Sequence, residues 1–230
     1  MSRLVLVLAV AALAGCGGGA HGTATVWITH DRGAQLVLAR DVPAGLTAMQ
    51  ALDRVADIET RYGGRYVQSI DGVAGSLAQR RDWFYFINGY EGDRSAAEYR
   101  LHDGDVEWWD FRSWKSRMRE PVVVGAFPEP FVHGFNGKRR PARVVYFVPG
   151  QRAEAERVAL LVHGEATRDV REARAKHWNL VVLAPTTGRT ALKASFASPR
   201  PGSPVVFVYA GNPALLLAKP PFGHRRYEVP

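Results

Sequence analysis

A single cysteine, Cys16, constrains the fold of this 230-residue chain more than any other feature. One cysteine cannot form an intramolecular disulfide, and residues 17–230 contain neither a cysteine nucleophile nor a thiolate ligand for a metal. The fold must therefore rest on its hydrophobic core. Hydrophobic residues make up 47% of the sequence, which is enough for such a core. The length that follows residue 15 suits one or two domains.

The N-terminal end has the pattern of an export signal. Arg3 is the only charged residue before Cys16, residues 4–13 are an unbroken apolar run, and Ala14 and Gly15 are small. This run has the length of a signal-peptide core and is far shorter than the ~20 residues that a membrane-spanning helix needs. Residues 1–15 are therefore expected to be a signal peptide that is removed.

The segment Leu13-Ala14-Gly15-Cys16 resembles the lipobox of bacterial lipoproteins. The resemblance implies that Cys16 is lipidated and that the chain is anchored at the extracytoplasmic face of the cell membrane, since several acyl chains give stable anchoring. The alternative is an ordinary secretory signal. Residues 16–22 are rich in glycine and are expected to be a flexible tether.

Charge is distributed unevenly along the chain. Residues 16–120 contain 13 Lys and Arg against 15 Asp and Glu, whereas residues 121–230 contain 16 against 7. This asymmetry predicts two units, which we place at residues 23–118 and 119–230. Outside the cell the basic unit could meet anionic lipid headgroups, wall polymers or an acidic partner, and nucleic acid is not expected. The alternative is an arginine-rich surface that is simply solvated.

The first unit has the pattern of an α+β fold. Thr47 and Gln50 form a capping-box pattern at the start of a helix, whose apolar face continues to Ile58 before Gly63-Gly64 ends it. Strands flank this helix on both sides, so we expect a mixed sheet that wraps around it. The alternation of apolar and polar residues places these strands at 24–28, 35–40, 66–70, 83–87 and 106–111.

Three motifs of this unit, taken in order, carry a family resemblance. They are Val67-Gln68-Ser69-Ile70-Asp71-Gly72-Val73, Trp83-Phe84-Tyr85-Phe86-Ile87-Asn88-Gly89, and Asp103-Gly104-Asp105 followed by Trp108-Trp109. The set resembles the transcobalamin C-terminal-like domain, a β-grasp module also named DUF4430, over about residues 24–115. The resemblance implies a β-grasp-like roll.

The same resemblance implies a ligand. In the vitamin B12 carriers of animals the related domain closes over the corrinoid together with a helical barrel, so cobalamin or another corrinoid is the implied ligand here, with no other cofactor expected. This sequence shows no such barrel. The second unit or a partner chain would have to supply the opposite wall.

Aromatic residues are the candidates for ligand contact. Trp83 and Tyr85 share one face of a strand, and Phe84 and Phe86 share the other. The face outside the core could form an exposed platform for a flat or cyclic ligand or a sugar. For each residue the alternative is a place in the core, and alternation does not say which face is exposed. The predicted ligand-binding residues are Trp83, Tyr85, Asn88, Tyr90, Trp108, Trp109 and Trp114.

A proline-rich crossing segment leads into the second unit. Its residues 128–134, Pro-Glu-Pro-Phe-Val-His-Gly, resemble a segment of bacterial lipoproteins that carry the same module. His133 and Glu129 together fall short of the three or four ligands that a zinc site needs. We therefore predict no metal site and favour His133 as a turn residue.

The second unit has the pattern of a small basic α/β domain. Leu160-Leu161-Val162-His163-Gly164 resembles the strand and His-Gly corner of α/β-hydrolases, but no Gly-x-Ser-x-Gly motif is present. We therefore predict no enzymatic activity and no catalytic residue. Strands are predicted at 144–148, 158–162, 180–183, 205–209 and 215–218, and helices at 151–156 and 166–177.

These observations combine into one hypothesis and one rival. The hypothesis is a two-domain lipoprotein whose units flank a cleft and which captures a small ligand for a membrane importer. The rival is a cell-surface module that binds other proteins or the wall through its basic half or through open sheet edges.

Overall fold

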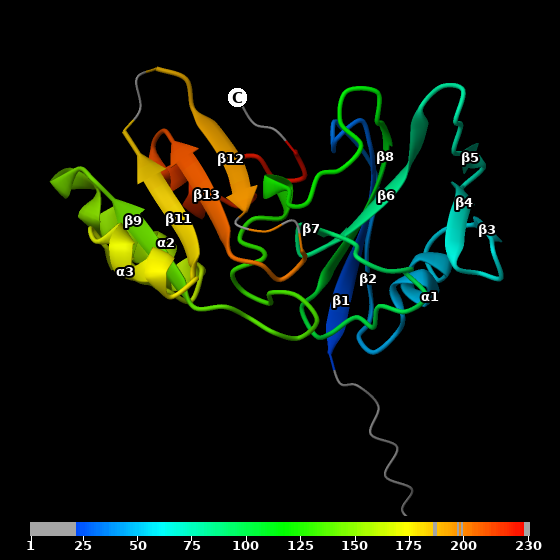
Figure 1. The fold of residues 1–230 in the computed structure, drawn as a ribbon, viewed down its shortest axis with the longest axis horizontal. Coiled ribbons are helices and arrows are strands. Elements are labelled where there is room, and N and C mark those ends of the chain that lie inside the picture. The colour runs from blue at the N-terminus through cyan, green and yellow to red at the C-terminus, as the bar shows by residue number, and fades with distance from the viewer. Residues whose placement is uncertain (1–21, 186–187, 197, 199, 228–230) are drawn as a thin grey trace, which may run out of the picture.

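The computed structural model describes residues 22–185, 188–196, 198 and 200–227. The predicted signal peptide, Cys16 and most of the predicted tether lie outside the described residues. The described chain is a mixed α+β structure that consists mostly of sheets, and its two sheet-based halves lie side by side (Figure 1). None of the helices in the described part of the chain is long and apolar enough to cross a membrane.

A five-stranded sheet forms the centre of the first half, with strand order β2-β1-β8-β6-β7. The central strand β8 pairs in parallel with β1 and antiparallel with β6. The five strands are β1 (Thr23–His30), β2 (Gln35–Pro43), β6 (Arg81–Ile87), β7 (Tyr90–Glu91) and β8 (Val106–Ser113). Four of the five strands predicted for this half are β1, β2, β6 and β8 of this sheet, and each extends beyond its predicted bounds. The fifth, predicted at 66–70, is present in a separate small sheet.

One face of this sheet is covered by α1 (Ala48–Asp53) and by a small sheet of order β3-β4-β5. The small sheet consists of β3 (Ile58–Arg61), β4 (Tyr66–Ile70) and β5 (Val73–Ala74). The capping box at Thr47 and Gln50 is formed as predicted, with both reciprocal hydrogen bonds present. The helix is shorter than predicted, because the chain turns after Asp53 and Ile58 begins a strand.

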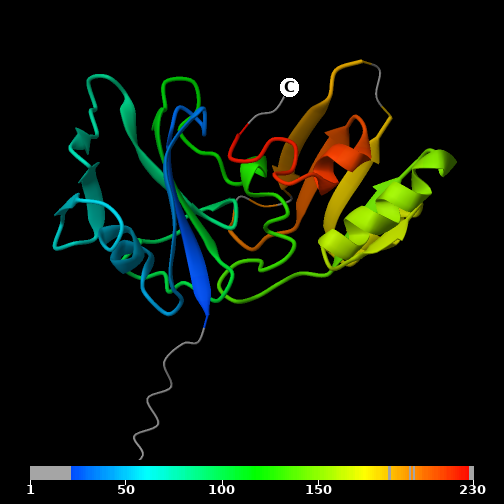
Figure 2. The same cartoon turned by 180° about the vertical axis from the view of Figure 1, so that it is seen from behind.

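The second half contains another five-stranded sheet, of order β10-β9-β11-β13-β12. All of its pairs are parallel except β12 with β13. Two helices, α2 (Arg152–Leu161) and α3 (Val170–Ala175), pack beside the sheet (Figure 2). The strands are β9 (Ala142–Tyr146), β10 (Glu165–Thr167), β11 (Asn179–Ala184), β12 (Ala191–Phe196) and β13 (Val205–Ala210).

Several elements of the second half differ from prediction. The strand predicted at 158–162 is the end of α2, because Ala155, Val158 and Ala159 follow helical spacing and bury one face. The strand predicted at 215–218 is the 3-10 helix η3 (Pro213–Leu217), which the Asn212 side chain caps. Strands β10 and β12 were not predicted, and β10 occupies the start of the helix predicted at 166–177, of which α3 (Val170–Ala175) is the helical part. The Leu160–Gly164 segment is therefore a helix end, and its likeness to a hydrolase strand and corner does not hold.

The crossing segment joins the two halves and contributes to both. It contains the 3-10 helix η1 (Val124–Ala126), whereas the 3-10 helix η2 (Pro149–Gln151) lies within the second half, between β9 and α2. Phe131 packs edge-on against Phe207 of β13, with ring centroids 5.0 Å apart. The Tyr90 hydroxyl of the first half donates a hydrogen bond to the Ser203 carbonyl of the second, at 2.8 Å. One continuous core cluster therefore runs through both halves.

The C-terminal segment, residues 222–227, returns to the first half. The backbone N–H of Arg225 donates to the Gly125 carbonyl at 2.8 Å, and that of Tyr227 donates to the Arg32 carbonyl at 3.3 Å. Tyr227 is buried against Trp108 and Phe86. The far end of the chain thus completes the packing of the sheet that begins it.

Candidate ligand pocket

Strand alternation divides the aromatic residues of the first sheet between its two faces. The register pairs Tyr85 with Trp109, and Trp83 with Phe111, on the face that α1 covers. The opposite face carries Phe86 and Trp108, which the C-terminal segment covers. Each face is therefore closed by another part of the chain, and the predicted exposed platform does not form.

A pocket of about 210 Å³ remains on the α1 face. Its main wall is a stacked aromatic pair, Tyr85 and Trp109, whose ring centroids are 5.1 Å apart at an interplanar angle of 25°. An engineered apolar cavity of ~150 Å³ binds benzene, so this pocket has room for a planar group of about one or two rings. The lining residues are Met49, Arg65, Tyr66, Val67, Trp83, Phe84, Tyr85, Glu91, Gly92, Arg94, Ser95, Ala96 and Trp109.

The Tyr85 ring is fixed in place on several sides. Its hydroxyl donates a hydrogen bond to the Arg94 carbonyl. Burial raises the pKa of Tyr85, so the hydroxyl stays protonated at physiological pH. A Cβ at Gly92 would lie 2.1 Å from the Tyr85 ring, so only glycine lets the backbone approach this closely. The wall is thus preorganised rather than formed by a mobile side chain.

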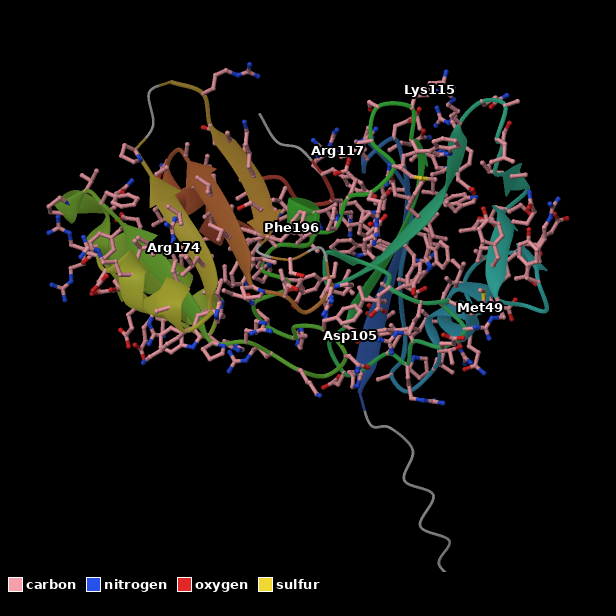
Figure 3. All side chains as sticks on the ribbon, viewed as in Figure 1. Met49, Asp105, Lys115, Arg117, Arg174 and Phe196 are labelled. Atoms are coloured by element: carbon pink, nitrogen blue, oxygen red, sulfur yellow. The ribbon has the colours of Figure 1, made fainter. Side chains whose placement is uncertain are left out.

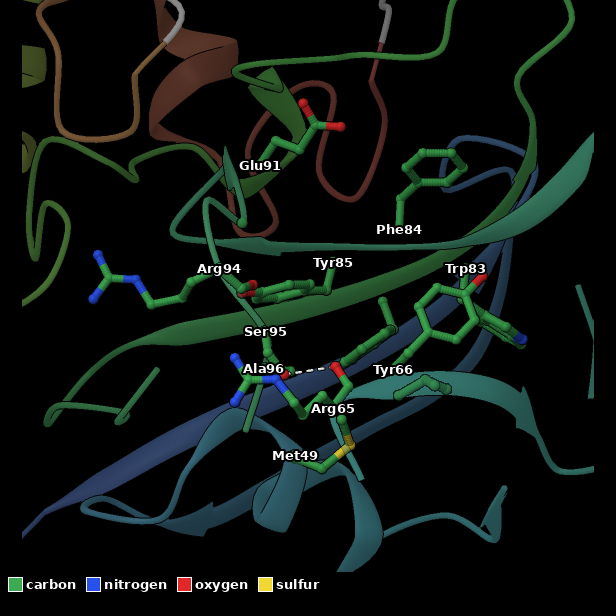
Figure 4. Close-up of a pocket in the computed structure, with 13 residues that line it drawn as sticks. Met49, Arg65, Tyr66, Trp83, Phe84, Tyr85, Glu91, Arg94, Ser95 and Ala96 are labelled. Carbon is green, nitrogen blue, oxygen red and sulfur yellow. Dashed lines mark hydrogen bonds between the residues drawn. The ribbon is translucent and has the colours of Figure 1, made fainter. Parts of the chain in front are cut away.

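Polar groups gather at the rim of the pocket (Figure 4). The Ser95 hydroxyl donates to the Arg65 carbonyl at 2.6 Å, and the Arg65 guanidinium forms an ion pair with Glu98. The Tyr66 hydroxyl donates to Asp82 at 2.5 Å. These contacts tie the loop at residues 92–96 to β4. Phe84 and Glu91 point away from the pocket, as the close-up shows.

A buried carboxyl group supports the wall from beneath. The indole N–H of Trp109 donates to Glu107 Oε1 at 2.5 Å, and Glu107 is fully buried. Burial raises the pKa of Glu107 well above its ordinary value, because the charged form is poorly solvated there. Glu107 Oε2 has no hydrogen-bond partner among the described residues. This carboxyl fixes the indole ring and does not reach the pocket.

Four of the seven predicted residues lie outside the pocket. The Trp108 indole N–H donates to Thr29 Oγ1 at 2.7 Å on the opposite face of the sheet. Asn88 is buried in a turn, where its amide donates to Asp105 Oδ1 at 2.7 Å. Tyr90 is buried between the two halves. Trp114 follows β8, where its backbone N–H donates to the Arg80 carbonyl at 2.9 Å.

The structure brings Trp83, Tyr85 and Trp109 together at one site. The sequence patterns did not predict the other residues that line the pocket. Some of these residues lie in or next to the predicted motifs and helix. Tyr66 directly precedes the 67–73 motif, while Met49 belongs to the predicted helix. Arg65, Arg94 and Ser95 come from loops, where no periodic pattern marks a functional position. Met49 is a buried residue of α1 (Figure 3).

His133 and Glu129 form a pair in the crossing segment. His133 Nδ1 lies 2.5 Å from Glu129 Oε1, and the backbone N–H of His133 donates to Glu129 Oε2 at 2.9 Å. The hydrogen bond with Glu129 raises the pKa of His133, an effect that burial partly opposes. Within the described ranges no three His, Cys, Asp or Glu residues are grouped so that they could hold a metal ion. The pair serves to close a turn.

Comparisons with known proteins place the pocket in a recognised domain. Residues 45–113 match the family model described as "Domain of unknown function (DUF4430)", and the family resemblance is therefore confirmed for this part of the chain. The matched segment begins just before α1 and ends with β8, so it contains every residue that lines the pocket.

Curated proteins gave no match. Among solved structures, the chain is similar to a crystal structure described as "a putative metal binding protein from Ruminococcus gnavus ATCC 29149". The identity is 18% and the TM-score 0.33, over 40% of this chain and 97% of the other.

Proposed function

We propose that this chain is a lipid-anchored, extracytoplasmic binding protein whose DUF4430 domain holds a planar group of a small ligand. The stacked Tyr85–Trp109 wall carries the proposal, because it leaves an open pocket beside two preorganised aromatic rings. Convergent polar groups at the rim, from Arg65 and Ser95, would orient what enters. In keeping with the family resemblance, the first half is a β-grasp-like roll, and the protein binds rather than catalyses.

A corrinoid is the ligand that the resemblance suggests, and the pocket sets a limit on how it binds. The volume suits one or two rings, so a whole corrin macrocycle does not fit. We propose that a flat substituent of the ligand enters and that the macrocycle stays outside the rim. Delivery of the bound ligand to a membrane importer completes this proposal.

Calorimetric titration of the purified protein with cobalamin and its precursors tests the proposal, with Trp fluorescence followed in parallel. Binding should quench Trp fluorescence, and it should be lost in Tyr85→Ala, which removes one stacked ring. The matched control is Phe84→Ala, because Phe84 is the next residue on the same strand and points away from the pocket. Absence of binding across the panel, or equal loss in both variants, would contradict the proposal.

The rival function is a cell-surface interaction module, and an exposed apolar group in the basic half favours it. Phe147, Val148 and Leu160 are all exposed there, and Leu160 is 76% exposed. Exposed apolar side chains mark a protein interaction site where they lie together on the surface. Recovery of a specific envelope partner that Leu160→Glu abolishes would support this function, and recovery that the variant leaves unchanged would count against it.

A further inference from the structure

A second cavity lies between the two halves, and Arg94 is the one residue that its lining shares with the aromatic pocket. It has a volume of about 500 Å³, which is within the range of ~300–1,000 Å³ typical of small-molecule sites. Three separate segments form its walls. The lining residues are Asp93, Arg94, Phe135, Asn136, Lys138, Arg139, Arg140, Pro141, Pro201 and Gly202.

The lining of this cavity is strongly basic. It contains four cationic side chains and a single carboxylate, Asp93. Arg94 already holds that carboxylate in a two-point ion pair, with Nε–Oδ1 2.8 Å and Nη2–Oδ2 3.0 Å. No acidic side chain of the lining is therefore left to balance the other three cations, which are Lys138, Arg139 and Arg140.

Backbone carbonyl groups hold two of these cations in position. Arg140 Nε donates to the Gly202 carbonyl at 2.6 Å and its Nη1 to the His177 carbonyl at 3.3 Å. Arg139 Nη1 donates to the His163 carbonyl at 3.2 Å. A guanidinium has five N–H donors, so each arginine keeps further donors for a ligand. Because these side chains are already fixed, ligand binding would cost little further conformational entropy.

Rigid neighbours shape the floor and walls of the cavity. Phe135 packs against Tyr90 and Tyr99, with ring centroids 5.6 and 5.1 Å away. Pro141 and Pro201 restrict the backbone on either side. In Figure 1 the chain just before β9 runs along the lower edge of the molecule from the first half to the second. A ligand here would touch both halves at once.

We propose that this interdomain cavity binds a compact phosphate-type anion that carries more than one negative charge. Fixed guanidinium groups match the oxygen geometry of phosphates, and a lysine adds a point charge. Three unbalanced cations favour a diphosphate or a phosphorylated headgroup over a monovalent carboxylate. Arg94 lines both cavities, but its guanidinium is paired with Asp93 and the proposal rests on Lys138, Arg139 and Arg140, which line only this cavity. The inference therefore does not depend on a ring-binding function.

Calorimetric titration of the whole protein with inorganic pyrophosphate tests the site. Lys138→Ala should weaken binding by about tenfold, because it removes one charge-assisted contact. This substitution is expected to leave folding intact, since no hydrogen bond or ion pair involves the exposed Lys138 side chain within the described part of the chain. The control is Lys193→Ala, which removes an exposed charge on β12 outside the cavity lining.

Two further arms separate the sources of the anion. Vesicles of phosphatidylcholine with phosphatidic acid present a phosphomonoester, which can carry two negative charges, as a lipid headgroup. Pyrophosphate presents the anion free in solution. Binding in either arm that weakens in Lys138→Ala and in Arg139→Ala, but not in Lys193→Ala, supports the proposal and identifies the source. No binding in either arm at low ionic strength, or equal weakening by Lys193→Ala, would overturn it.

Discussion

The two faces of the first sheet carry similar aromatic residues and yet differ in what they leave open. On the α1 face the stacked Tyr85–Trp109 pair borders a pocket. On the opposite face Trp108 meets Trp27 and Tyr227 edge-on, with centroids 5.7 and 5.2 Å away. The aromatic motif therefore predicts only that both faces are hydrophobic. Whether a face becomes part of the core or borders a pocket depends on the segment that packs against it.

Buried polar groups also distinguish the faces. Asp110, on the filled face, accepts hydrogen bonds from the Thr29 hydroxyl and from the backbone N–H groups of Arg32 and Gly33. Arg112 lies 3.7 Å above the Phe84 ring and donates to two carbonyl groups of the following loop. Glu107, on the pocket face, accepts only from Trp109 among the described residues. Both faces keep buried polar atoms without a hydrogen-bond partner among the described residues, namely Arg112 Nε and the Tyr227 hydroxyl on the filled face and Glu107 Oε2 on the pocket face. The difference is that the filled face surrounds Asp110 and Arg112 with more than one hydrogen bond each, whereas Glu107 has one.

The largest loss of stability is expected from a substitution on the filled face. Trp108→Ala should lower the free energy of unfolding by about 3–5 kcal/mol, because a fully buried indole leaves a cavity. Tyr85→Ala should cost less than half of that, since its ring already borders open space. Chemical denaturation of both variants measures the difference. Equal losses would mean that the two faces contribute alike to stability.

The second prediction uses pH to probe the pocket face. Because burial raises the folded-state pKa of Glu107 above 4.5, the unfolded chain loses this proton first as pH rises. The free energy of unfolding should then fall by up to about 1.4 kcal/mol per pH unit above pH 4.5, until the folded-state pKa is reached.

Glu107→Gln should remove this contribution, because the amide cannot ionise. Urea denaturation at several pH values between 4 and 8 compares the variant with the parent, and Glu154→Gln on α2 provides a control. Parallel pH profiles for Glu107→Gln and the parent would contradict the assignment.

The third prediction compares two glycines that lie against opposite faces. A Cβ at Gly125 would fall 2.4 Å from the backbone of Arg226, and one at Gly92 would fall 2.1 Å from the Tyr85 ring. Each alanine variant should lose about 1–3 kcal/mol of stability through overpacking. Only Gly92→Ala should also change Trp fluorescence quenching by the planar ligand, as a titration of both variants would show. A change confined to Gly125→Ala would reverse the assignment of the faces.

The smallest expected effect concerns the helix that covers the pocket. Thr47→Ala removes the side-chain acceptor of the capping box and should cost about 1 kcal/mol. Thr47→Ser keeps the hydroxyl and should restore most of that stability. Thermal unfolding of the two variants measures the effect, and identical midpoints for both would show that the cap is not important.

Local patterns predicted the first half well. The strands, the Thr47–Gln50 cap and the shared face of Trp83 and Tyr85 all follow from residues close together in sequence. The period of two could not separate Trp108 from Trp109 by function, since it defines two faces without saying what covers each. That information lies in residues 222–227, more than a hundred positions away.

The second half was predicted less accurately for a different physical reason. Val158–Val162 is a short apolar run, and such a run fits either a buried strand or a helix end. Strand β12 alternates Leu192, which is buried, with the exposed Lys193, but prolines and polar residues surround it and hide the pattern. The cavity between the halves depends on loops that only the tertiary fold brings together.

The C-terminal segment can cover the first sheet only after the rest of the chain has been synthesised. Because translation proceeds from the N-terminus, β8 is complete long before Tyr227 is synthesised. The Trp27 and Trp108 rings therefore stay uncovered until the C-terminal segment packs on them. Until then this sheet carries an open aromatic surface that chaperones can recognise. A chain that lacked residues 222–227 would leave that surface uncovered, so this segment is needed to complete the packing of the first sheet.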